Sequence, residues 1–172
     1  MLFLVKPLFA ARSVVVVSTL LAAAAMPLPA AAQDESVFGD WTIRCDAIAD
    51  GAEQCALTQA VEAEDRDDVW LNAYAFRPAD SEGTTLLSIL VPLRVILPKG
   101  LGLRIDDAEL TVFDYVTCSV EGCLASINLT EAMITAMREG TEALFVIYFE
   151  DATGIGIPIS LNGFGDGLDA LP

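Results

Sequence analysis

Three carboxylates in the middle of the chain are the strongest candidates for catalytic chemistry. Asp106, Asp107 and Glu109 stand in the segment "IDDAE", directly after Arg104. A pair of carboxylates can act as general acid and base, as in glycoside hydrolysis. The sequence contains no histidine, so neither a Ser–His–Asp nor a Cys–His arrangement can form. A carboxylate-based hydrolase is therefore the enzymatic alternative, but charged turns between strands are far more common, and we expect the protein not to be an enzyme.

A second group of acids lies in "EAEDRDD", residues 62–68, and forms a loop in which carboxylates outnumber bases five to one. The Asp-x-Asp-x-Asp-Gly pattern of a calcium loop is missing, so we expect neither a metal nor a cofactor. The whole chain has a formal net charge of −16, which repels nucleic acid and attracts basic partners. We therefore expect a solvent-exposed loop that serves solubility or, as the alternative, faces a cationic partner. Its acids are Glu62, Glu64, Asp65, Asp67 and Asp68.

The four cysteines favour two short-range disulfides. Three pairings are formally possible, but Cys45 and Cys55 flank the bend "ADGAE", and Cys118 and Cys123 flank "SVEG". The spacings differ from the usual Cys-x2-Cys of zinc sites, and histidine is absent. We therefore predict the bonds Cys45–Cys55 and Cys118–Cys123, formed in an oxidising compartment.

The first 32 residues have the pattern of an export signal. Two basic residues, Lys6 and Arg12, precede an apolar run that ends at prolines, and a small-residue site stands before Gln33. The run is too short to span a membrane. We expect cleavage near Gln33, a single mature domain over residues 33–172 without a transmembrane segment, and a periplasmic or secreted location with possible outer-membrane association.

The mature part is predicted to be mainly β. Short segments rich in β-branched and aromatic residues alternate with turn signals, which indicates an antiparallel sandwich or a partly open barrel. One segment has helical spacing instead, and predicts a short helix near residues 130–139, capped by Thr130 and ended by Gly140. The glycine-rich tail, residues 162–172, either ends as an ordered edge or frays. At strand spacing, we expect the large aromatic residues to be core rather than interface: Trp41, Trp70, Tyr74, Phe76 and Tyr115.

Several motifs taken together resemble the invasion-associated locus B family. They are "FGDWTIRC" after the signal, "SILVPLRVILPKGLGLRIDD", "TCSVEGCLA" with the following helix, and the ending "PISLNGFGDGLDAL". The resemblance implies a small exported bacterial protein, linked in some relatives to host-cell invasion, with no assigned catalytic residues. It also implies that the four cysteines form disulfides and that Gly39, Asp40 and Trp41 are a structural motif. We therefore expect a non-enzymatic binding module whose partner is an unknown envelope or extracellular protein, possibly a basic one.

Overall fold

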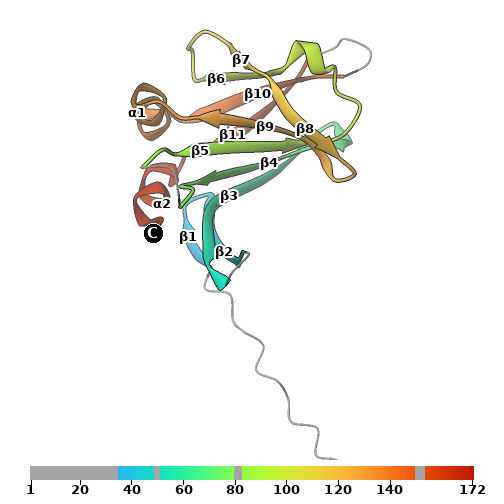
Figure 1. The fold of residues 1–172 in the computed structure, drawn as a ribbon. Coiled ribbons are helices and arrows are strands. Elements are labelled where there is room, and N and C mark those ends of the chain that lie inside the picture. Colours follow the sequence, from blue (N-terminus) through green and yellow to red (C-terminus); the bar gives the residue numbers. More distant parts are fainter. Residues whose placement is uncertain (1–34, 49–50, 80–82, 150–153) are drawn as a thin grey trace, which may run out of the picture. The chain divides into compact units, whose positions relative to one another are not determined.

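The computed structural model describes residues 35–48, 51–79, 83–149 and 154–172. The predicted export signal, residues 1–32, and the predicted cleavage point at Gln33 lie outside these ranges. The described residues belong to one compact unit, in which two antiparallel sheets pack face to face (Figure 1). The sheets are open rather than closed on each other, so the predicted sandwich is the correct architecture.

Within the described ranges, the larger sheet has seven strands in the order β1-β2-β3-β4-β5-β9-β8. All neighbours are antiparallel, and most follow one another in the chain. The strands are β1 (Ser36–Phe38), β2 (Trp41–Ala47), β3 (Glu53–Ala63), β4 (Arg66–Phe76), β5 (Leu86–Val91), β9 (Gly122–Asn128) and β8 (Tyr115–Ser119).

The smaller sheet has four strands in the same part of the chain, in the order β11-β10-β6-β7. The chain enters it after β5 and the short 3-10 helix η2 (Leu97–Lys99), leaves it for β8 and β9, and returns after the helical segment. The strands are β11 (Gly154–Ser160), β10 (Glu142–Tyr148), β6 (Leu101–Ile105) and β7 (Thr111–Phe113).

Two α-helices, not the single helix predicted, occur in the described residues. The first, α1 (Glu131–Glu139), begins and ends as predicted: the Thr130 hydroxyl accepts a hydrogen bond from the Met133 amide, and Gly140 is the C-cap. The second, α2 (Phe164–Ala170), occupies the tail for which we expected an edge or a frayed end. Both helices lie at the same end of the sheets, where Arg138 of α1 binds Asp169 of α2 (Figure 1).

The core lies between the inner faces of the two sheets. Alternate residues of each strand point inward, and both sheets and both helices contribute to one hydrophobic cluster. Helix α2 forms despite its glycines because Phe164 and Leu168 are buried, and because Gly167 lies so close to Leu57 that a Cβ there would come within 2.4 Å of it. Its formation therefore depends on tertiary packing rather than on local helix propensity.

Both predicted disulfides are present. Cys45–Cys55 joins β2 to β3 and Cys118–Cys123 joins β8 to β9, and in each case the two cysteines are direct register partners. All four cysteines of the sequence are therefore paired. Each bond closes one hairpin of the larger sheet next to its turn.

Candidate functional site

The outward face of the larger sheet carries a groove. Side chains on strands β2, β3, β4 and β5 line it, and its volume is about 630 Å³. A neighbouring hollow of about 530 Å³ shares Ala60 and Asn72 with it and extends the lined surface to Trp70. We call the first hollow the outer groove, defined by the side chains of Thr42, Thr58, Asn72, Tyr74 and Phe76.

Strand β4 supplies the aromatic part of the outer groove. Its inward residues are small or aliphatic and fully buried, whereas its outward residues are half-buried. The outward set is Trp70, Asn72, Tyr74 and Phe76. The prediction that these three aromatic residues belong to the core is therefore wrong, and of the five aromatic residues only Trp41 is fully buried.

The register with neighbouring strands explains why β4 turns its small residues inward. Ala75 lies between Leu57 of β3 and Leu87 of β5, and Ala73 lies between Gln59 and Ile89. A small side chain fits beside larger neighbours in a close-packed interior. The aromatic rings of β4 consequently project from the opposite face, because successive residues of a strand alternate.

A row of hydroxyl side chains crosses this face through five adjacent strands. Direct register partners are Thr42 with Thr58, Thr58 with Tyr74, Tyr74 with Ser88, and Ser88 with Ser126. Partners that lie opposite each other project from the same face of a sheet. We call these five residues the hydroxyl row. Thr58 donates to the Thr42 carbonyl at 3.0 Å, and the Ser88 and Ser126 hydroxyls are 2.9 Å apart.

Several polar groups in the outer groove remain available to a ligand. Within the described part of the chain, the side chains of Thr42, Asn72 and Tyr74 make no hydrogen bond. Their polar atoms are not buried, so a ligand can reach them. The charged groups at the groove are largely engaged. Arg44 pairs with Glu35 at 3.0 Å, and the Asp40 carboxylate accepts a hydrogen bond of 2.6 Å from the Ser160 hydroxyl.

The Gly39–Asp40–Trp41 motif lies at the end of this face and contacts the C-terminal segment. The Trp41 indole donates to the Ser160 carbonyl at 2.8 Å, and its ring packs edge-on against Phe164. The Asp40 amide donates to the Asn162 carbonyl at 3.1 Å. The two ends of the domain are thus joined through residues that are about 120 positions apart in sequence.

Gln59 completes this junction from the inner side of β3. Its amide donates to the carbonyls of Asp40 and Ser160, and its side-chain oxygen accepts from the Ser160 amide at 3.0 Å. Only 8% of the residue is exposed, so these bonds satisfy a buried polar group. Sequence reasoning did not identify Gln59, and the only signal was a polar residue at an inward position of a strand.

The predicted acidic loop is the closed end of a long hairpin. Strands β3 and β4 extend into it, so the connection is a turn at Glu64 and Asp65 with a bulge after Glu62. All five predicted acids are exposed. Arg66 donates two hydrogen bonds to Asp68, at 2.8 and 3.0 Å, and these hold the pKa of Asp68 below its ordinary value. We call these five acids the acidic hairpin end.

The alternative catalytic carboxylates lie outside the two hollows described above. The Asp106 carboxylate accepts hydrogen bonds from the amides of Thr141 and Glu142, at 3.0–3.2 Å, and so connects the end of β6 to the start of β10. Asp107 and Glu109 are exposed, and none of the three lines the outer groove.

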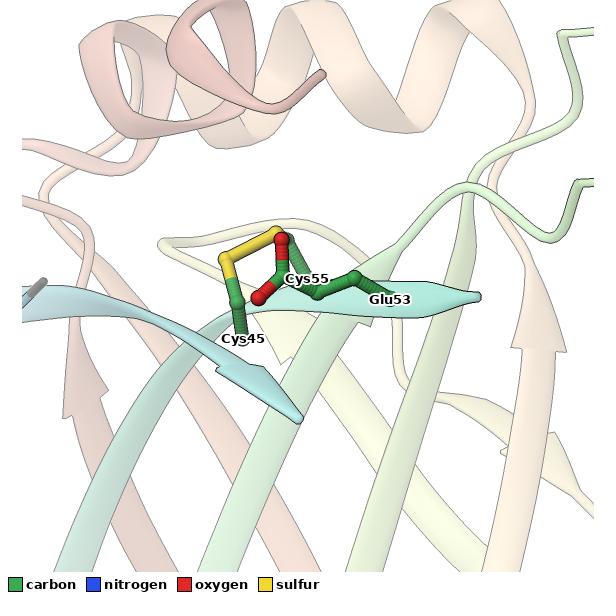
Figure 2. A group of neighbouring side chains, drawn as sticks. All are labelled: Cys45, Glu53 and Cys55. Atoms are coloured by element: carbon green, nitrogen blue, oxygen red, sulfur yellow. A yellow bond between two sulfur atoms is a disulfide. The ribbon is translucent and has the colours of Figure 1, made fainter. Parts of the chain in front are cut away.

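One group of potential metal ligands occurs among the described residues, at the first disulfide. Glu53 lies beside Cys45 and Cys55, with the ligand atoms within 4.8 Å of one another (Figure 2). The two sulfur atoms are bonded to each other, so they offer no thiolate to a metal. The arrangement is a disulfide with an adjacent carboxylate.

Comparison with known proteins agrees with these features. The family model described as "Invasion associated locus B (IalB) protein" matches residues 41–172. An Invasion protein B homolog of Brucella abortus is 28% identical over 153 residues, 88% of this chain and 87% of the relative. Invasion protein B of Bartonella bacilliformis is 26% identical over 138 residues, which cover 78% of this chain and 72% of that protein.

A solved structure has the same fold. The crystal structure of invasion associated protein b from Bartonella henselae superimposes with a TM-score of 0.66 at 20% sequence identity. The match covers 78% of this chain and 92% of that one. At this level of identity the match shows a shared fold and nothing about function.

Proposed function

The chain belongs to the invasion associated locus B family, and on this premise we propose that it is exported and acts by binding in the periplasm or outside the cell, without catalysing a reaction. The relatives named as invasion proteins support a role at the bacterial envelope or in contact with another cell. Two disulfides support an oxidising compartment. In the described residues, no helix has the length and apolar character that crossing a membrane requires.

The observation that carries the binding role is the composition of the outer groove. An exposed sheet face in a chain of net charge −16 is expected to be covered by charged residues. The outer groove has only three charged residues in its lining, Asp40, Arg44 and Asp46, and otherwise presents mainly aromatic, hydroxyl, amide and small side chains, with Tyr74 and Phe76 half-buried. A hollow of this size in which aromatic side chains stand beside convergent polar groups is a candidate ligand site.

The environment of Asp106 supports binding over the carboxylate hydrolase. A catalytic carboxylate must be able to reach a substrate atom or a water molecule. Asp106 is exposed, but both of its oxygens accept hydrogen bonds from backbone amides, which supports a structural task for this residue.

The export part of the proposal is tested by fractionating the source bacterium and sequencing the N-terminus of the processed protein. We expect a chain that begins near Gln33 in the periplasm or the medium. A variant without residues 1–32 should remain in the cytoplasm. Recovery of the intact N-terminus from exported material would contradict the proposed cleavage.

The binding part is tested with envelope fractions. We expect the exported protein to bind them, and the double variant Asn72→Ala, Tyr74→Ala to lose most of this binding. The matched control is Tyr148→Ala, because Tyr148 is a half-buried tyrosine on the outward face of the smaller sheet. Equal binding by the double variant and the wild type would refute a role for the outer groove.

The acidic hairpin end is the second surface that we propose for a partner. Its exposed carboxylates would accelerate the approach of a basic envelope protein, because opposite charges steer association. Neutralising the acids that Arg66 does not hold should slow association at low salt and leave folding unchanged. These acids are Glu62, Glu64, Asp65 and Asp67. An unchanged association rate would show that they serve solubility alone.

A further inference from the structure

We propose that the ligand of the outer groove is a neutral oligosaccharide, whose rings pack on Tyr74 and Phe76 and whose hydroxyls bind the hydroxyl row and Asn72. This inference rests on the proposed binding function and adds the chemical class of the ligand. Four features of the face carry it: its position within the sheet, its charge, its aromatic side chains and its hydrogen-bonding groups.

The outer groove lies over the middle of the sheet, where the backbone is already bonded. Strands β3, β4 and β5 each have a neighbour on both sides. Extended peptides bind sheets mainly by adding a strand to a free edge, where backbone groups are unpaired. The ligand of this groove therefore has to be held by side chains, which favours a molecule rich in its own hydrogen-bonding groups over a peptide strand.

The charge of the outer groove favours a neutral ligand. Of its charged groups, Arg44 is paired with Glu35, and the Asp40 carboxylate accepts a hydrogen bond from Ser160. Asp46, exposed at the end of β2, is the remaining acid of the lining. None of the five carboxylates of the acidic hairpin end lines the outer groove, although one of them, Glu62, lines the neighbouring hollow beside Trp70. A strongly anionic ligand would be repelled by the net charge of −16, and a strongly cationic ligand would find more carboxylates at the hairpin.

The aromatic side chains provide flat surfaces at regular intervals. Outward residues two positions apart on a strand are separated by about 7 Å, so Tyr74 and Phe76 lie at that spacing along β4. Trp70 follows beyond Asn72, about 13 Å from Tyr74 along the same strand. The apolar C–H face of a pyranose packs on the electron-rich face of such a ring. Half-buried rings are held by their surroundings and still expose part of their surface.

The polar groups match the hydroxyls of a sugar. Each sugar hydroxyl is both donor and acceptor, and so is each hydroxyl of Thr42, Thr58 and Tyr74. Asn72 offers an amide donor and a carbonyl acceptor from one side chain. Thr42, Asn72 and Tyr74 make no hydrogen bond in the described structure, so they can bind a ligand without breaking an internal bond. A row of such groups beside aromatic rings can contact successive sugar units.

The test uses the exported protein and three neutral tetrasaccharides as probes: the β1,4-linked and α1,4-linked tetramers of glucose, and the β1,4-linked tetramer of N-acetylglucosamine. Binding is measured by calorimetry and by chemical-shift changes. We expect at least one probe to bind, and we expect Tyr74→Ala and Asn72→Ala each to weaken that binding about tenfold. Tyr74→Phe keeps the ring and should lose less affinity than Tyr74→Ala.

Matched controls separate binding from folding. Tyr148→Ala and Thr117→Val alter the same residue types away from the outer groove and should leave affinity unchanged. Thr42→Val preserves side-chain shape while removing a hydroxyl of the groove, so it should fold normally and bind more weakly. Thermal unfolding of every variant checks that the domain is intact.

Two outcomes would overturn the inference: no binding of any of the three probes, or binding that the groove variants leave unchanged. Binding of the protein to envelope fractions then distinguishes a wrong ligand class from a failure of the proposed binding function. Periodate cleaves the vicinal diols of 1,4-linked glucose, and a chitinase cleaves 1,4-linked N-acetylglucosamine, which has no vicinal diol within the chain. The treatment that matches the bound probe should abolish binding of the protein to these fractions, whereas protease treatment should not. Binding that depends on Tyr74 and Asn72 but is lost only after protease treatment would keep the proposed function and refute the saccharide.

Discussion

The contact between the two ends of the domain can be tested at Gly163, which precedes α2. Its φ is +86°, and a Cβ added there would lie 2.1 Å from the Phe38 carbonyl oxygen. The two atoms nearest to this Cβ would be the carbonyl oxygen and carbon of Phe38, which are backbone atoms at the end of β1. A backbone atom cannot rotate away as a flexible side chain can, so Gly163→Ala must push the C-terminal segment away from the Gly39 turn.

The magnitude follows from a matched comparison with Gly83. This glycine has a φ of +84°, and no atom lies within 4 Å of an added Cβ. Gly83→Ala therefore measures the backbone strain alone, about 1–2 kcal/mol, reduced by about 0.4–1 kcal/mol because alanine restricts the unfolded chain. Gly163→Ala should incur the same cost of backbone strain. It should also lose the hydrogen bonds across the junction, each worth about 1 kcal/mol. Two of these are from Trp41 to Ser160 and from Asp40 to Asn162.

We therefore expect Gly163→Ala to lower the free energy of unfolding by about 3–4 kcal/mol, and Gly83→Ala by about 1 kcal/mol or less. Urea denaturation and calorimetry measure both losses, and the difference corresponds to roughly 7–10 °C in Tm for a domain of this size. Equal losses in the two variants would refute the reasoning, because strain at positive φ would then explain both without any close approach.

Three further outcomes are expected. Replacing Cys45 and Cys55 together by alanine should cost roughly 2–3 kcal/mol of stability in urea denaturation, by the loop-closure estimate, and an unchanged midpoint would contradict it. Burial raises the pKa of Tyr115 to about 12, and its hydroxyl has no partner in the described structure. The neutral phenol therefore contributes stability that is complete below about pH 10 and is lost as the pH rises through 12. Tyr115→Phe should reduce this alkaline loss, and it should not destabilise the protein at pH 7. The hydrogen bond from Arg138 lowers the pKa of Asp169, so its contribution is present above the ordinary carboxyl pKa of about 4 and is lost as the pH falls below that value. Asp169→Asn should make stability less dependent on pH between 5 and 3, and identical acid profiles would exclude this contribution.

Local signals in the sequence were sufficient for the features that depend on neighbouring residues. The Thr130 cap, the Gly140 end and the spacing between them predicted α1, because helix ends are set by hydrogen bonds within one turn. The short disulfides were predictable for the same reason, since each pair flanks a turn and a hairpin places its ends opposite each other. Alternation along the chain likewise predicted a mainly β fold, either a sandwich or a partly open barrel, and the structure is the sandwich.

Tertiary structure alone decided which surface is the candidate site. The period of two in β4 separates its aromatic residues from its small ones but does not say which set faces the core, because alternation is symmetric. Ala73 and Ala75 point inward since larger residues of β3 and β5 already fill the space beside them. The hydroxyl row exists only because the registers of five strands align residues far apart in sequence. Helix α2 was missed because buried contacts, absent from any local pattern, stabilise a glycine-rich segment that has low helix propensity by itself.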